Sequence, residues 1–129
     1  TGSAQRAAQI ISRVGDRLVL LSGDDATAFP LYTLGAQGCI SVVSNVAPAE
    51  TGLMCCLFLE GETEAAAAIH HVLFPLGKAM FAETNPIPVK YAASLLGLCR
   101  PEPRLPLLPL SEARRAPLKA ALKKAGVLR

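Results

Sequence analysis

The chain has 129 residues, of which 51% are hydrophobic and 18% charged, and its formal net charge is +3. This balance indicates a globular protein and excludes an intrinsically disordered chain, in which apolar residues are scarce. No uninterrupted apolar run reaches the roughly 18 residues of a membrane span. The first residues also lack the basic start and apolar run of a signal peptide. We therefore expect a soluble, cytoplasmic protein.

The first part of the chain alternates predicted helices and strands. Residues 4–14 have helical periodicity, and Gly15 ends that helix. Residues 18–21 and 39–43 are short apolar runs, typical of strands that are buried on both faces. Residues 24–34 between them form a predicted helix. Strand, helix and strand at this spacing imply parallel strands joined by a right-handed crossover.

After residue 48 the strand signals stop and prolines set the expected helix ends. Asn85 is a good N-cap with Pro86 at the first helical position. Pro75 predicts a kink or break near Phe74, and Pro117 is expected in the first turn of the last helix. The prolines between residues 99 and 110 predict an extended crossing without a strand. The predicted helices are 48–60, 62–82, 86–97 and 115–125.

Three segments together resemble the dihydrodipicolinate synthase family, and the resemblance runs from Thr1 to Gly126. They are residues 18–25 (LVLLSGDD), 38–45 (GCISVVSN) and 85–90 (NPIPVK). The last, an asparagine followed by Pro-Ile-Pro-Val-Lys, is the most specific. The resemblance implies an α/β fold: the C-terminal part of a (β/α)8 TIM barrel, with its last two strands, followed by an α-helical C-terminal domain. We place the barrel portion at 1–61 and the helical domain at 62–129.

The resemblance also implies the activity of the family. These enzymes condense pyruvate with L-aspartate 4-semialdehyde through a lysine Schiff base, in lysine and diaminopimelate biosynthesis. A complete barrel needs about 250 residues, so the upstream half of the same polypeptide is an expected partner. The family's Schiff-base lysine lies just before the stretch that matches Thr1, and neither Lys78 nor Lys90 stands in a matching position. No cofactor is expected, because the protonated imine is itself the electron sink.

The expected site residues in this chain are substrate-binding and not catalytic. In the family, the position of Ile40 contributes its backbone carbonyl beside the pyruvate-derived imine, and that of Gly23 lines the same pocket. From its residue type alone, Ile40 would be a buried strand residue without a role. We interpret Asp24 and Asp25 as helix-capping residues. Sialic acid lyases on the same barrel carry a further acid where this chain has Ala26, which disfavours a polyhydroxylated substrate.

Other chemistries receive less support from the sequence. The four cysteines, of which two are adjacent, indicate reduced thiols, and their spacing does not predict a metal site. We expect His70 and His71 to have packing or surface roles, one facing solvent and the other a seam between helices. The basic C-terminal tail contains no aromatic residue, which is typical of a solvated helix face and not of nucleic-acid binding.

Two alternatives stay open, and so does the assembly. The chain could serve another pyruvate-dependent class I aldolase of the N-acetylneuraminate lyase type, or it could be a non-catalytic fragment or paralogue. Family members are commonly homotetramers built as dimers of dimers. The resemblance places Ala4, Gln5 and Leu34 near the weaker of the two interfaces.

Overall fold

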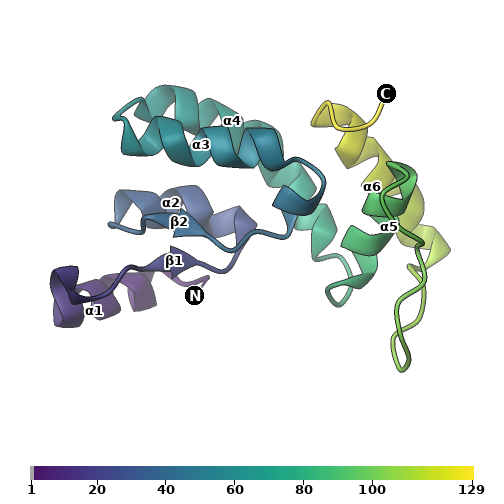
Figure 1. Ribbon diagram of the computed structural model, residues 1–129, viewed down its shortest axis with the longest axis horizontal. Coiled ribbons are helices and arrows are strands. Elements are labelled where there is room, and N and C mark those ends of the chain that lie inside the picture. The colour runs from purple at the N-terminus through teal and green to yellow at the C-terminus, as the bar shows by residue number, and fades with distance from the viewer. Residues whose placement is uncertain (1) are drawn as a thin grey trace.

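The computed structural model describes residues 2–129, which fold mainly into helices, with one short pair of strands toward the N-terminal end (Figure 1). Within this range no helix is both long and apolar enough to cross a bilayer. The α-helices are α1 (Ala4–Val14), α2 (Ala28–Thr33), α3 (Pro48–Leu59), α4 (Thr63–Met80), α5 (Ile87–Leu95) and α6 (Glu112–Lys124). The strands are β1 (Leu21–Ser22) and β2 (Gly38–Cys39), and single 3-10 turns form η1 (Gly15–Arg17), η2 (Asp25–Thr27) and η3 (Val43–Asn45).

The two strands run parallel, with Leu21 opposite Gly38 and Ser22 opposite Cys39. The Ile40 N–H extends the pairing by donating to the Ser22 carbonyl at 2.7 Å. This confirms the predicted parallel arrangement, with η2 and α2 in the crossover. The strands are shorter than predicted, because the backbone leaves the ladder after Ile40 and Val43 belongs to η3.

The prediction that the first strand is buried on both faces is wrong for this chain. Leu20 packs against a buried cluster and Ser22 is fully buried. Val19 and Leu21, which alternate with them along the strand, are 65% and 40% exposed. One face of the strand pair is therefore covered by the helices, and the other is open.

Two groups of buried apolar side chains hold the chain together. The first, which we call the strand-side cluster, connects α1, α2, the turn before β2, α3 and the first half of α4. Leu31 and Tyr32 are its largest members. Its buried residues are Ala7, Ala28, Leu31, Tyr32, Ala36, Met54 and Ala66.

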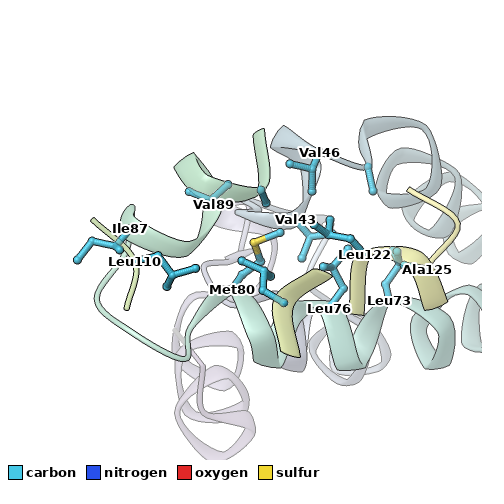
Figure 2. Close-up of a cluster of buried hydrophobic side chains, with 13 residues drawn as sticks. Val43, Val46, Leu73, Leu76, Met80, Ile87, Val89, Leu110, Leu122 and Ala125 are labelled. Carbon is cyan, nitrogen blue, oxygen red and sulfur yellow. The ribbon is translucent and has the colours of Figure 1, made fainter. Parts of the chain in front are cut away.

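The second group, the helical cluster, joins η3 to α4, α5 and α6 at the opposite end of the molecule (Figures 1 and 2). Met80 and Leu76 of α4 and Leu122 of α6 are fully buried in it. Its buried residues are Val43, Val46, Ala47, Leu73, Leu76, Met80, Ile87, Val89, Ala92, Leu110, Leu118, Leu122 and Ala125.

Helix α4 passes through both clusters without interruption, so the predicted break near Phe74 does not occur. A kink at that point stays a prediction. Pro75 removes one backbone donor inside this helix. Leu73 and Leu76, on either side of it, are buried in the helical cluster. Tertiary packing of this apolar face offsets the missing bond, as it commonly outweighs local preference in helices.

Two predicted helix starts are also wrong. Helix α5 begins at Ile87, one residue later than predicted, so Pro86 precedes it and Asn85 is not its N-cap. Helix α6 begins at Glu112, which places Pro117 inside the helix and not in its first turn. A residue outside the helix stabilises the start of α6: the N–H and the hydroxyl of Ser111 both donate to Glu83 Oε1.

The segment between α5 and α6 contains no strand, as predicted. Gly97 ends α5 with a φ of 73°, a conformation that glycine adopts without strain. Leu105 and Leu108 are exposed in a loop that projects from the molecule (Figure 1), and Leu110 is buried where the loop returns. The division of the chain into two domains near Gly61 stays a prediction.

Candidate functional site

The two predicted site residues leave the sheet at the same edge. Ser22 and Cys39 are paired in the parallel ladder. Gly23 follows Ser22, and Ile40 follows Cys39. The carboxyl ends of parallel barrel strands are where active sites are built. The Ile40 side chain is 69% exposed, so it lacks the burial of an ordinary strand isoleucine.

The turn that contains Gly23 is fixed by Ser22. The Ser22 hydroxyl donates to the Asp24 carbonyl at 3.0 Å and accepts the Asp24 N–H at 3.2 Å. Asp24 Oδ1 then accepts the Ala26 N–H at 3.0 Å and caps η2. The predicted capping role is therefore confirmed for Asp24.

Asp25 uses its carboxylate differently from the prediction. Its Oδ2 accepts the backbone N–H groups of Val42 at 2.9 Å and of Val43 at 3.2 Å. Its Oδ1 accepts the Ser41 hydroxyl. The side chain thus joins the end of β1 to the segment that follows Ile40. Sequence reasoning missed this contact because it joins residues that are 16 to 18 positions apart.

A cavity of about 550 Å³ lies between the segment after β2 and the helical part of the chain. Ile40 and Asn45 line one side, and Asn85, Lys90 and Cys99 line the other. The predicted site residue Ile40 is therefore part of a pocket wall, whereas Gly23 is not among its lining residues. Asn85 and Lys90 belong to the specific NPIPVK segment, but the sequence did not predict that they face Ile40.

The two histidines are not placed for acid–base chemistry. The His70 ring stacks on Phe29 at 5.4 Å between centroids, and His71 is exposed. This confirms the predicted division between a helix seam and solvent. Burial, with a smaller contribution from His71, lowers the pKa of His70 below its ordinary value of 6.5. His70 is therefore a neutral packing residue at neutral pH.

All four cysteines are free, and residues 2–129 contain no group of His, Cys, Asp and Glu that could hold a metal ion. Burial raises the pKa of Cys39, and burial beside Cys39 and Cys55 raises that of Tyr32. Because a thiolate is the nucleophilic form of cysteine, burial makes Cys39 less reactive than an exposed thiol.

Comparison with known proteins gives consistent matches along almost the whole chain. The model of the dihydrodipicolinate synthetase family matches residues 1–125. The 4-hydroxy-tetrahydrodipicolinate synthase of Pelobacter propionicus is 46% identical over 128 residues, which cover 99% of this chain and 44% of that protein. The enzyme of the same name from Thermomicrobium roseum is 48% identical over 122 residues, covering 95% and 40%.

Solved structures agree. The crystal structure of dihydrodipicolinate synthase from Thermotoga maritima matches with a TM-score of 0.94 at 39% identity, over 99% of this chain and 44% of that one. This chain therefore spans less than half the length of the relatives it matches. Its fold is the C-terminal part of a (β/α)8 barrel followed by a helical region, as predicted.

Proposed function

Because the chain belongs to the dihydrodipicolinate synthetase family, we propose that it is the C-terminal part of a 4-hydroxy-tetrahydrodipicolinate synthase. The observation that carries the proposal is the match over residues 1–125 to this family. The whole enzyme would be a lyase of the class I aldolase type, acting in the cytoplasm in lysine and diaminopimelate biosynthesis. It would need no cofactor.

In the proposed reaction, pyruvate forms an imine with a lysine supplied by the upstream part of the barrel. Loss of a proton gives the enamine, which attacks the aldehyde carbon of aspartate semialdehyde, and cyclisation with loss of the lysine gives the product. Ile40 would direct its backbone carbonyl at the imine, and Gly23 would line the pocket beside it. Their common edge of the sheet supports this assignment.

The upstream part of the barrel is the proposed partner of the open strand face. Val19 and Leu21 are large apolar residues that are 65% and 40% exposed. Parallel sheets in α/β proteins are covered on both faces. Added strands would cover these side chains and would satisfy the free strand edges, which otherwise favour aggregation.

We further propose that the complete enzyme forms a homotetramer. Ala4, Gln5 and Leu34 would lie near its weaker interface, and all three are exposed in this chain. Assembly differs among related proteins, because one structure that is 40% identical is described as a monomeric dihydrodipicolinate synthase variant. Sedimentation of the complete enzyme would distinguish the two states.

The proposal is tested by completing the barrel. The upstream part of the Pelobacter propionicus enzyme would be fused ahead of Thr1, treated with pyruvate and borohydride, and mapped by peptide mass spectrometry. We expect a pyruvate adduct on a lysine upstream of Thr1, together with condensation of aspartate semialdehyde. The matched control is this chain alone, which should form no adduct.

Other outcomes would contradict the proposal. A soluble fusion protein without an adduct indicates a non-catalytic relative. A fusion protein that forms the adduct but cleaves N-acetylneuraminate, and does not condense aspartate semialdehyde, indicates the lyase-type aldolase instead. An insoluble fusion protein contradicts the proposed fit between the two parts.

A further inference from the structure

The backbone around Ile40 is not held by the Ile40 side chain. That side chain is mainly exposed, and the segment after it belongs to neither β2 nor η3. On the side of the sheet, the Ile40 N–H donates to the Ser22 carbonyl. A second anchor is needed on the other side of the Ile40 carbonyl if that group is to keep one direction.

Asp25 supplies the second anchor. Its carboxylate accepts three hydrogen bonds from consecutive residues: the Ser41 hydroxyl and the N–H groups of Val42 and Val43. Hydrogen bonds to an ionised acceptor are about twice as strong as those between neutral groups. The Ser41 hydroxyl also accepts the Ser44 N–H at 2.8 Å. The bonds of Asp25 therefore extend directly into η3.

Helix α4 holds Asp25 against this segment from behind. A Cβ atom built on Gly77 would lie 3.4 Å from Asp25 Cβ and 3.9 Å from Val43 Cγ2. The missing side chain thus allows α4 to pack directly against both ends of the Asp25–Val43 contact. The adjacent acid, Asp24, accepts the Ala26 N–H, two positions further along the chain. Asp25 therefore differs from Asp24 in reaching the segment after Ile40.

We propose that Asp25 is a positioning residue that fixes the direction of the Ile40 carbonyl through its bonds to Ser41, Val42 and Val43. The inference rests on the proposed function, in which this carbonyl faces the pyruvate-derived imine. Misplacing a group near the reacting atoms by about 1 Å can cost 100-fold in rate. Asp25 would thus act on the chemical step without touching the substrate.

The test compares two substitutions in the completed barrel. Asp25→Asn keeps the shape of the side chain but loses one acceptor and the charge, and we expect kcat/KM to fall roughly 10- to 100-fold, mainly through kcat. Ser41→Ala leaves both backbone bonds in place, so we expect a smaller loss of roughly three- to tenfold. The double variant loses all three bonds of the Asp25 carboxylate, so we expect a larger loss than in either single variant.

Thr51→Val is the matched control. It removes a buried hydrogen bond from the Thr51 hydroxyl to the Ala47 carbonyl at the start of α3 and leaves the three Asp25 bonds in place, so it should lower the melting temperature without lowering kcat. A second measurement is amide hydrogen exchange on this chain. We expect faster exchange of the Val42 and Val43 N–H groups in Asp25→Asn, and no such change in Thr51→Val.

The outcomes separate the two proposals. An active completed barrel whose kcat is unchanged by Asp25→Asn overturns the positioning role and leaves the proposed function intact. Unchanged exchange at Val42 and Val43 overturns the role as well. A completed barrel without activity or imine contradicts the proposed function, and the exchange data still report whether Asp25 holds the segment. Equal loss of kcat in Thr51→Val would indicate a general stability effect.

Discussion

The two apolar clusters differ in how far this chain completes them. The helical cluster is enclosed by four elements that all lie within the chain, and Leu76, Met80 and Leu122 are fully buried in it. The strand-side cluster is covered by helices on one face only, while Val19 and Leu21 project from the other face of the strand. A region can therefore be finished locally while its neighbour in the same chain still needs strands from elsewhere.

The largest effect is expected from a charge placed on the open strand face, which would test whether that face needs to be covered. Val19→Lys should prevent productive completion of the barrel, because an unpaired ammonium enclosed on that face costs several kcal/mol. The same substitution should make the isolated chain less prone to aggregate, since it interrupts an exposed apolar strand. Yield of soluble, active fusion protein and light scattering of the isolated chain measure the two effects.

Ala120→Lys is the control for this charge, because Ala120 is exposed on α6, far from the strands. It should affect neither measurement. If Val19→Lys assembled as well as the original sequence, Val19 would not face the barrel interior.

Substitutions that create a cavity in each cluster test the comparison further. Leu122→Ala should lower the free energy of unfolding by about 2–5 kcal/mol, because the enclosed helical cluster cannot collapse around the space. Leu31→Ala, although equally buried, should cost less in the isolated chain, where the open strand face can adjust, and more in the completed barrel. Urea unfolding measures these changes.

Leu108→Ala is the reference for these substitutions, since Leu108 is exposed in the projecting loop and should change stability by less than about 0.5 kcal/mol. Equal losses for Leu31→Ala in both contexts would contradict the difference drawn between the clusters.

A smaller effect concerns the pH dependence of stability through His70, which packs between α4 and α2. The pKa of His70 is lowered, so between that value and 6.5 the unfolded chain binds more protons than the folded chain. Stability should fall as the pH drops below about 6.5 and level off below the folded pKa. His70→Phe should remove this part of the pH dependence in thermal unfolding. His71→Gln should keep most of it, because burial is the larger cause.

The smallest effect is expected at the ion pair between Arg115 and Glu112. It joins residues three apart on α6, with 90% of the Glu112 side chain exposed. Glu112→Gln should change the unfolding free energy by less than about 1 kcal/mol, and added salt should reduce the difference. A larger loss would show that the start of α6 depends on this pair.

The sequence predicted the order of elements because local signals set it. The helical periodicity of residues 4–14 and the capping by Asp24 follow from neighbouring residues. The parallel strands follow from the order and spacing of strand, helix and strand along the chain. Helix starts at prolines were predicted less well. For Pro117, the hydrogen bonds from Ser111 to Glu83 outweigh the local preference, and such contacts join residues 28 positions apart.

The candidate site was predicted only in part for the same reason. The family resemblance alone singled out Ile40, because its residue type predicts a buried strand residue without a role. Asp25 looked like a second capping residue, because the backbone groups that it binds become neighbours only when β1 and β2 pair. Asn85, just before α5, and Lys90 within it reach the cavity by the packing of α5 against η3, which no local pattern reveals.

Helix α4 contributes Ala66 to one cluster and Leu73, Leu76 and Met80 to the other, and Ile69 packs against both. Its 18 residues span about 27 Å, so the length of the helix sets the distance between the strands and the C-terminal helices. Inserting a single residue between Ile69 and Leu73 would turn the second set of side chains by about 100° relative to the first. The length of this helix should therefore tolerate less variation than that of the projecting loop.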